Sequence, residues 1–260
     1  MNELKDKLAQ RRPVVGGWLS IGHPSVAELM SLMEFDFILV DLEHTPISLD
    51  AVQQLVHAIE AADTKTQPVI RVPSNDPSWV QRILDTGVTN IMVPKVGTAD
   101  EARRVVESSQ YPPEGSRGIA GSRATGYGLN FEEYVSSIND DILIVAQIEN
   151  ETGIANASEI AATNGITALF VGPADLSGAL DCFGRWDSPE YTGAVETIID
   201  RARRHDVPTG TFSADPADVG TQIDHGFDFI IAGKDASHIV NGCREAKDAF
   251  YDAASETVER

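Results

Sequence analysis

Short apolar runs of strand length recur along the chain, and segments of helical periodicity separate them. Most of these runs are continuously apolar rather than alternating, which is typical of parallel strands covered on both faces. The pattern predicts eight strands, at residues 14–19, 35–40, 68–72, 90–94, 142–148, 168–172, 207–212 and 227–232.

Amphipathic helical patterns lie between the expected strands. Apolar residues recur on one face of Leu49–Ala61, and Ser48 can cap the N-terminus of this segment. Thr98 and Glu101 have the spacing of a capping box before residues 102–109. Further helices are expected at residues 76–86, 151–163, 190–205, 216–225 and 235–253.

This alternation predicts an α/β fold, a (β/α)8 TIM barrel, because eight strand–helix units in about 250 residues are the usual size of that fold. The rival is an open doubly wound sheet, which normally carries G-x-G-x-x-G after its first strand. Here that position reads SIGHPS, and no P-loop is present. We therefore expect residues 1–260 to form a single barrel domain. The Gly-rich stretch at residues 111–128 is long enough to be a functional loop.

The chain is strongly acidic, with Lys+Arg 20, Asp+Glu 40 and a formal net charge of -20. This charge argues against nucleic acid or an anionic membrane as a partner. Many carboxylates beside only six lysines suit a high-salt cytoplasm, which is the basis of a halophile hypothesis. There is no apolar run of transmembrane length and no signal-peptide pattern, so we expect a cytoplasmic protein.

Polar residues cluster where the expected strands end, which is where the active site of such a barrel lies. Glu149 and Asp175 follow neighbouring strands, and Gln147 shares a strand face with Glu149. Two carboxylates with few histidines and no nearby thiolates suggest Mg²⁺ or Mn²⁺, whereas Zn²⁺ would favour more His or Cys. The alternative is that both carboxylates merely cap loops, and the pattern leaves both interpretations open.

Three further residues have both a chemical and a structural interpretation. His44, which follows Asp41 and Glu43, is either an acid/base group or a hydrogen-bonded loop residue. Arg71 can stabilise an enolate oxygen, or it forms a structural salt bridge with Asp41 or Glu43. Asp85, near the end of its expected helix, either orients His44 or is a surface charge.

Seven motifs together resemble the HpcH/HpaI aldolase family, the class II pyruvate aldolases. They span the chain from Trp18 to about Asp235, in the order in which the family carries them. The motifs are VDLEHTP, PVIRVPSNDP, IMVPKV, YPPEGSRG, VAQIEN, FVGPADLS and FDFIIAGKD.

The resemblance implies a barrel of the phosphoenolpyruvate/pyruvate superfamily, usually a homohexamer in which neighbours exchange a helix, here about residues 235–253. It implies a divalent metal, Mg²⁺ or Mn²⁺ with Co²⁺ as a third option, held by Glu149 and Asp175. Pyruvate would contact Gln147 and the segment Gly172, Pro173, Ala174 and Asp175.

The resemblance also assigns the chemistry. His44 matches the catalytic base, Asp85 the carboxylate that raises its basicity, and Arg71 the arginine that stabilises the transition state. The reaction would be reversible cleavage of a 4-hydroxy-2-oxo acid to pyruvate and an aldehyde. Sugar-acid substrates and 4-hydroxy-2-oxoheptanedioate are both candidates, and the loop at residues 121–128 would lie near the aldehyde.

Three other interpretations compete with this one. A Schiff-base aldolase would use Lys95 or Lys234, both at strand ends. A citramalyl- or malyl-CoA lyase would share the metal chemistry, although the acidic chain offers no obvious basic pocket for CoA phosphates. A non-catalytic barrel would bind an oxo acid without turnover.

Overall fold

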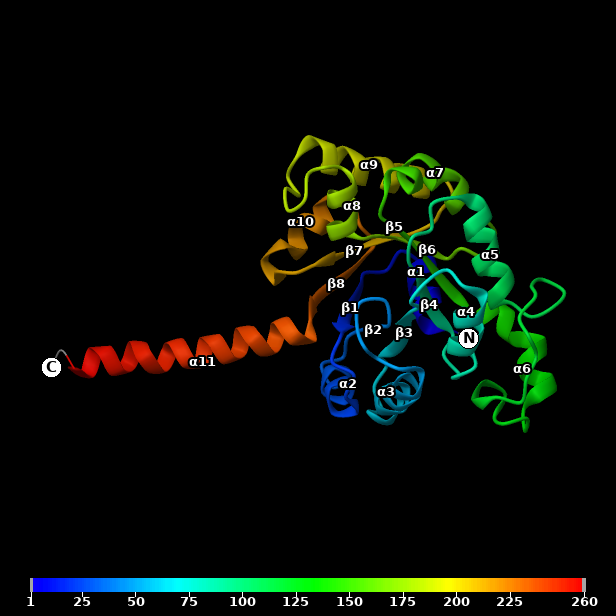
Figure 1. Ribbon diagram of the computed structural model, residues 1–260, viewed down its shortest axis with the longest axis horizontal. Helices are drawn as coiled ribbons and strands as arrows, with labels where there is room; N and C mark the ends of the chain where they lie inside the picture. Colours follow the sequence, from blue (N-terminus) through cyan, green and yellow to red (C-terminus); the bar gives the residue numbers. More distant parts are fainter. Residues whose placement is uncertain (1, 259–260) are drawn as a thin grey trace.

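Eight parallel strands close into a barrel in sequence order in the computed structural model, which describes residues 2–258 and the side chains of residues 2–254 (Figure 1). The predicted (β/α)8 barrel is therefore confirmed. The strands are β1 (Val14–Leu19), β2 (Phe37–Asp41), β3 (Gln67–Arg71), β4 (Asn90–Val93), β5 (Leu143–Ile148), β6 (Ala168–Val171), β7 (Thr209–Ser213) and β8 (Phe229–Lys234).

Helices follow each strand, with extra short helices at the ends of the barrel. The predicted helix Leu49–Ala61 and the capping box of Thr98 and Glu101 are both present. The helices are α1 (Glu3–Ala9), α2 (Pro24–Ser31), α3 (Leu49–Ala61), α4 (Pro77–Leu84), α5 (Ala99–Ser109), α6 (Phe131–Ser137), α7 (Glu151–Ala161), α8 (Pro173–Ala179), α9 (Pro189–Arg203), α10 (Val219–Asp224) and α11 (Asp235–Val258), with 3-10 turns at Arg123–Thr125, Ile138–Asp141 and Pro216–Asp218.

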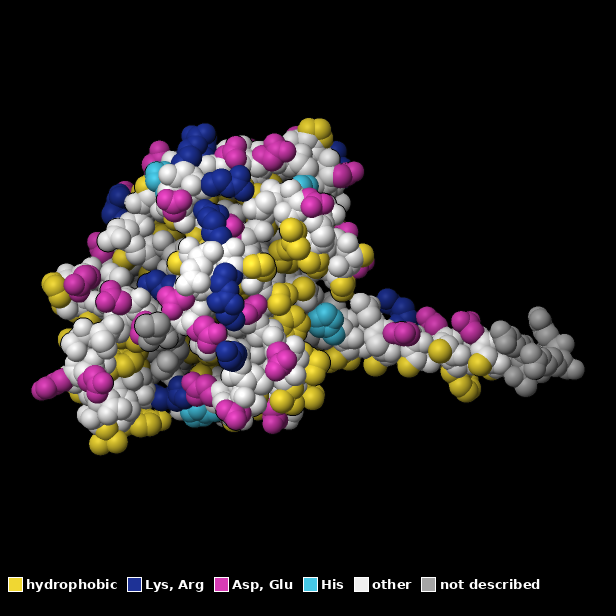
Figure 2. Space-filling model, turned by 180° about the vertical axis from the view of Figure 1, so that it is seen from behind, with side chains coloured by type: hydrophobic (Ala, Val, Ile, Leu, Met, Phe, Trp, Pro, Cys, Tyr) yellow, Lys and Arg dark blue, Asp and Glu magenta, His cyan; other side chains and the backbone are white. Residues whose placement is uncertain are grey.

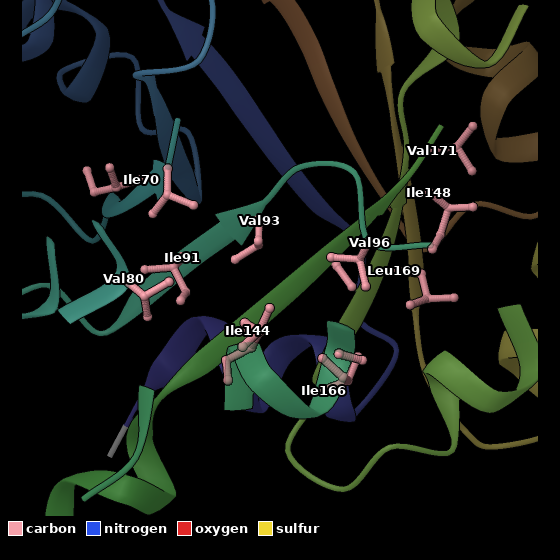
Figure 3. Packing of buried hydrophobic residues seen from close by; sticks show 14 of the residues in the cluster. Ile70, Val80, Ile91, Val93, Val96, Ile144, Ile148, Ile166, Leu169 and Val171 are labelled. Carbon is pink, nitrogen blue, oxygen red and sulfur yellow. The ribbon is translucent and has the colours of Figure 1, made fainter. Parts of the chain in front are cut away.

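Buried apolar residues form two layers. One fills the barrel interior and includes Phe37, Leu39 and Phe229. The other lies between the strands and the surrounding helices, where Val80 of α4 lies beside Ile70 and Ile91 (Figure 3). This double burial explains why the strands have continuous apolar runs, since alternate residues of each strand serve different layers.

Helix α1 was not predicted from the sequence. The first twelve residues are rich in charge, but Leu4 and Leu8 are one helical turn apart and both are buried. They join the cluster inside the barrel, so α1 closes the end of the barrel where the strands begin. The short helices α2, α6 and α8 were also not predicted.

The last helix, α11, projects away from the barrel (Figure 1). A helix in this position normally covers the outer faces of β8 and β1. Here Val15 on β1 is 38% exposed, and α11 exposes Phe250 and Tyr251. Hydrophobic side chains gather at the base of the projecting helix (Figure 2). None of the described helices combines the length and apolar character needed to cross a membrane.

Candidate active site

A cavity of about 200 Å³ opens where the strands end, and it gathers most of the residues that the sequence singled out. His44, Arg71, Gln147 and Asp175 all line it, although they come from four different parts of the chain. The full lining is Trp18, Asp41, His44, Arg71, Gln147, Phe170, Gly172, Pro173, Ala174, Asp175, Phe212 and Lys234. The convergence follows from the topology, because parallel strands deliver their carboxyl ends to one edge.

Arg71, at the end of β3, is buried and contacts Asp41, Glu43 and Trp18. Its Nε donates to Asp41 Oδ1 at 2.9 Å, its Nη2 lies 2.8 Å from Asp41 Oδ2, and its Nη1 lies 3.0 Å from Glu43 Oε2. The guanidinium carbon lies 4.5 Å from the centroid of the Trp18 ring. A guanidinium has five N–H donors, so donors remain on Arg71 beyond these three contacts, and Arg71 also lines the cavity.

Asp41 is the main anchor of this arginine. Burial alone would raise the pKa of Asp41, but the hydrogen bond and charge of Arg71 and the backbone N–H groups of Glu43 and His44 hold it below its ordinary value. Asp41 is therefore a carboxylate at neutral pH. Arg71 does form the salt bridge that the structural interpretation expects, and this is compatible with the chemical interpretation, since Arg71 also lines the cavity.

Glu43 links Arg71 to Lys95. The Lys95 ammonium lies 3.0 Å from Glu43 Oε1, and Glu43 is itself almost fully buried. The hydrogen bond and charge of Glu43 raise the pKa of Lys95, and the nearby Glu149 and Asp175 carboxylates add to this effect. Lys95 is therefore protonated at neutral pH, which argues against it as a Schiff-base nucleophile.

Glu149, at the end of β5, is buried beside other carboxylates. Its Oε1 accepts the Lys95 backbone N–H at 2.9 Å, and its Oε2 accepts a hydrogen bond from the Gln147 amide. Burial, with the negative charges of Glu43 and Asp175, raises the pKa of Glu149 to about 7. Because burial and neighbouring carboxylates disfavour the negative charge of Glu149, this side chain is suited to binding a cation.

The backbone of Gly172 packs closely against these two side chains. A Cβ atom at this position would lie 2.7 Å from Gln147 Nε2 and 3.0 Å from Glu149 Oε2. Gly172 also caps α8, which carries Asp175 in its first turn. Gln147 Oε1 is buried without a hydrogen-bond partner among the described residues. Gln147 also lines the cavity, and an unsatisfied acceptor beside a cavity is typical of a site that receives a ligand.

His44 lies at the rim of the cavity, with its side chain 56% exposed. Its Nε2 lies 3.8 Å from Glu43 Oε2, and its backbone N–H donates to Asp41 Oδ1 at 3.3 Å. Asp41 therefore positions both the arginine and the loop that carries the histidine.

Asp85 does not join this group within one chain. It caps the C-terminus of α4, and that end of the helix leads into the start of β4. Because helices run antiparallel to the strands, Asp85 lies at the end of the barrel opposite to the cavity. There it pairs with the buried Arg117 at 2.8 Å, which in turn stacks on Tyr111.

Sequence reasoning missed the apolar wall of the cavity, formed by Trp18, Phe170 and Phe212. Trp18 packs edge-to-face on Phe212 with ring centroids 5.3 Å apart. The signal was present, because these aromatic residues lie at or near the ends of their strands, on the same face as other barrel-interior residues. Their apolar character concealed them among the core residues.

The described residues contain no group of three or more His, Cys, Asp or Glu side chains arranged to hold a metal. This does not conflict with the predicted site, which has two carboxylate ligands and leaves other positions to water and substrate. The raised pKa of Glu149 and the unpaired Gln147 oxygen, beside a cavity that Asp175 also lines, together fit a divalent cation.

Comparison with known proteins agrees with this geometry. The family model described as HpcH/HpaI aldolase/citrate lyase matches residues 15–242. A hydroxypyruvate/pyruvate aldolase of Paraburkholderia phytofirmans is 37% identical, over 94% of this chain and 96% of the relative. A 5-keto-4-deoxy-D-glucarate aldolase of Shigella sonnei is 33% identical, over 96% of each chain.

A solved structure shows the same agreement in three dimensions. The crystal structure of an HpcH/HpaI aldolase/citrate lyase family protein from Burkholderia cenocepacia superposes with a TM-score of 0.94 at 32% identity. The match covers 96% of this chain and 100% of that chain. The resemblance drawn from seven short motifs is confirmed, and this chain belongs to the HpcH/HpaI aldolase/citrate lyase family.

Proposed function

We propose that this chain is a metal-dependent pyruvate aldolase that cleaves a 4-hydroxy-2-oxo acid reversibly to pyruvate and an aldehyde. One observation carries the proposal: Arg71 lines the same small cavity as Asp175 and Gln147, and the buried carboxylate Glu149, whose pKa Asp175 helps to raise, accepts a hydrogen bond from Gln147. An aldolase needs both features, because the enolate oxygen of pyruvate must be stabilised while the C–C bond breaks. The names of the two aldolase relatives support the same reaction class.

Aldolases of this family generally depend on a divalent metal, and we propose Mg²⁺ or Mn²⁺ here, with Co²⁺ as a third option. Glu149 and Asp175 would hold it, because both offer the hard oxygen ligands that these ions prefer. When bound, the ion supplies a positive charge that polarises the 2-oxo group of the substrate. Gln147, Gly172, Pro173 and Ala174 would shape the place of the pyruvate portion, since all four line the cavity.

The protein side chains perform the remaining steps. His44 takes the proton of the C4 hydroxyl, the C3–C4 bond breaks, and its electron pair passes to the C2 oxygen as the enolate of pyruvate. The free Arg71 donors stabilise that oxygen. Return of a proton to C3 gives pyruvate, and the former C4 leaves as an aldehyde. His44 suits proton exchange because it is at the rim, accessible from solvent.

The role expected for Asp85 requires a second copy of the chain. Within one chain it lies at the opposite end of the barrel from His44, so it could raise the basicity of only a neighbour's histidine. We therefore propose that the active form is a homo-oligomer, as the resemblance to hexameric relatives implies.

Helix α11 offers a way to build that oligomer. It leaves uncovered a region of the barrel where Val15, and Leu29 and Met33 at the nearby α2, are exposed. It also carries its own exposed apolar residues, Ile239, Val240, Phe250 and Tyr251. We propose that residues 1–260 form one barrel domain whose C-terminal helix covers this region on another copy, because exposed apolar faces of this kind mark interaction sites. A cytoplasmic location stays a prediction.

Pyruvate release tests the proposed function. A panel of 4-hydroxy-2-oxo acids is supplied at high salt with Mg²⁺ or Mn²⁺, and pyruvate is measured by a coupled lactate dehydrogenase assay. We expect turnover that a chelator abolishes and the metal restores. Glu149→Gln should lose activity, whereas the matched change Glu159→Gln on the exposed face of α7 should retain it.

The alternatives give different results in the same assay. Turnover that survives the chelator, with pyruvate trapped on a lysine by borohydride, would favour the Schiff-base mechanism. Cleavage of acyl-CoA substrates alone would favour a CoA lyase. Binding of oxo acids without turnover across the whole panel would identify a non-catalytic barrel.

A further inference from the structure

Strand β8 contains an irregularity beside the cavity. Gly16 of β1 pairs with Ile231, but Trp18 pairs with Lys234, so β8 uses one residue more than β1 over the same stretch. The extra residue falls around Gly233, which has a φ of 81°. This is a β-bulge, and its backbone favours glycine, because L side chains are rarely stable at such a φ.

The bulge changes the direction of the side chain that follows it. Phe229 and Ile231 belong to the barrel interior, whereas Ile230 belongs to the outer layer. Regular alternation would therefore send Lys234 outward with Ile230. Instead Lys234 is half-buried and lines the cavity. Bulges near active sites often re-aim a side chain in this way.

Lys234 has no ionic partner among the side chains of residues 2–254. No hydrogen bond or ion pair joins it to any of them, whereas Lys95, the other lysine at this end of the barrel, lies 3.0 Å from Glu43. The neighbouring wall consists of Trp18, Phe170 and Phe212, which offer no acceptor for an ammonium group. A cation beside an apolar wall gains most from an anionic ligand, because the wall limits its hydration.

The position of Lys234 separates it from the groups that would hold pyruvate. Gln147 and Glu149 are on β5 and Asp175 follows β6, while β7 with Phe212 lies between these strands and β8. A second anionic group on the substrate, away from the pyruvate portion, would therefore be attracted to Lys234.

We propose that Lys234 is a specificity-determining residue, which binds a carboxylate on the portion of the substrate that leaves as the aldehyde. This inference rests on the proposed function and assigns one residue of the same cavity to the recognition of that carboxylate. Lys234 is a binding residue in it and forms no covalent bond.

Two aldehydes of equal chain length test the proposal in the addition direction. Succinic semialdehyde carries a carboxylate where butanal carries a methyl group. We expect Lys234→Met to lower kcat/KM for succinic semialdehyde about 10- to 100-fold, the usual effect of losing one charge-assisted hydrogen bond. The kcat/KM for butanal and the KM for pyruvate should differ from those of the native chain by less than about 3-fold, because neither substrate contacts this ammonium group.

Two further variants separate charge from structure. Lys234→Arg keeps the positive charge and should retain most of the preference for succinic semialdehyde. Lys65→Met removes a lysine that is 83% exposed and lies before β3, at the far end of the barrel, and it should change kcat/KM for neither aldehyde. An equal loss of kcat/KM for both aldehydes in Lys234→Met would overturn the proposal, as would a raised KM for pyruvate alone.

The test also distinguishes failure of the inference from failure of the proposed function. If the native chain turns over neither aldehyde, binding of glutarate and of butyrate is compared by tryptophan fluorescence in the presence of Mg²⁺. Tighter binding of glutarate that Lys234→Met removes would support the anion site without aldolase activity. Equal binding of both acids would contradict it. Borohydride trapping of pyruvate on Lys234 would also overturn the proposal, since it requires a nucleophilic amine.

Discussion

Arg71 depends on its neighbours for its orientation. Asp41 and Glu43 lie within 3.0 Å of three of its nitrogens, and Trp18 supports the flat face of the guanidinium. Full removal of the arginine would leave the buried Asp41 carboxylate without its cationic partner, which costs about 3–5 kcal/mol in comparable buried pairs. A test of its chemical role must therefore keep the charge.

Arg71→Lys meets that requirement. A lysine keeps a positive charge near Asp41 but cannot reproduce the planar set of donors or the contact with Trp18. We expect pyruvate formation to fall about 10²- to 10³-fold, the effect of losing one well-placed donor to a developing oxyanion. The coupled pyruvate assay measures this, and circular dichroism checks that the fold persists. A folded variant with native activity would show that Arg71 is structural only.

Glu149 leads to a prediction about protons. Its pKa is about 7 before a cation binds, and a cation requires the carboxylate form. Binding of Mg²⁺ should therefore release close to one proton at pH 6 and almost none at pH 8.5. Calorimetry in buffers of different ionisation enthalpy measures this number. The same release at both pH values would contradict the raised pKa.

The raised pKa of Glu149 also determines how the stability of the fold depends on pH. A carboxyl group with a raised pKa in the folded state stabilises the fold fully below its unfolded value of 4.5, and the stabilisation is lost as the pH rises through about 7. Mg²⁺ should consequently raise Tm more at pH 8 than at pH 6. Glu43→Gln removes one of the negative charges that raise this pKa, so it should move the proton release to lower pH.

At the scale of elements, the apolar runs located all eight strands, because burial on both faces leaves few polar positions within them. The ends were less accurate where apolar residues extend beyond the hydrogen-bonded ladder. Val207 and Phe227 are buried but precede β7 and β8. The bulge at Gly233 could not be predicted from periodicity, since the register against β1 exists only in the closed barrel.

The candidate site was also predicted in part, because its residues lie at the ends of the strands that the apolar runs located. Polar residues at strand ends were recognisable, and His44, Arg71, Gln147 and Asp175 do meet in one cavity. The placing of Asp85 could have been anticipated, because a residue at the end of a barrel helix lies away from the ends of the strands. The network through Glu43 and Lys95 could not, because it depends on side-chain directions at two loops.

Helix α11 is the element with the clearest testable consequence. Phe250 and Tyr251 form an edge-to-face contact but are more than half exposed, which is unusual for adjacent large aromatic residues in a monomer. We expect the double change Phe250→Asp and Tyr251→Asp to convert the proposed homo-oligomer to smaller species in sedimentation velocity. Asn241→Asp, at another exposed position on the same helix, should leave the proposed assembly intact.

The surface that α11 would cover gives an independent check. Leu29→Asp, near the uncovered strand β1, should produce the same smaller species if the two surfaces meet. A native chain that sediments as a single copy would contradict the exchange of this helix. It would also remove the route by which Asp85 could reach a histidine.

The charge of the whole molecule sets a further condition on its stability. With a formal net charge of -20 spread over 260 residues, carboxylates repel each other more strongly in the folded state than in the expanded unfolded chain. Several basic residues already serve internal pairs, among them Arg71 and Arg117, and so do not offset charge at the surface. Dissolved salt must then provide much of the screening.

This condition predicts how stability should respond to salt. The screening length falls from about 10 Å at 0.1 M to about 3 Å at 1 M, so added KCl should weaken repulsion between neighbouring carboxylates. Since each kcal/mol shifts Tm by about 2–4 °C in a chain of this size, we expect 2 M KCl to raise Tm by roughly 5 °C or more over 0.1 M KCl. Differential scanning calorimetry measures the shift, with sucrose at matched osmolarity to separate screening from exclusion of the solute. A Tm that is unchanged by KCl, or that rises equally in sucrose, would reject the halophile hypothesis and reduce the acidic excess to an ordinary solvated surface.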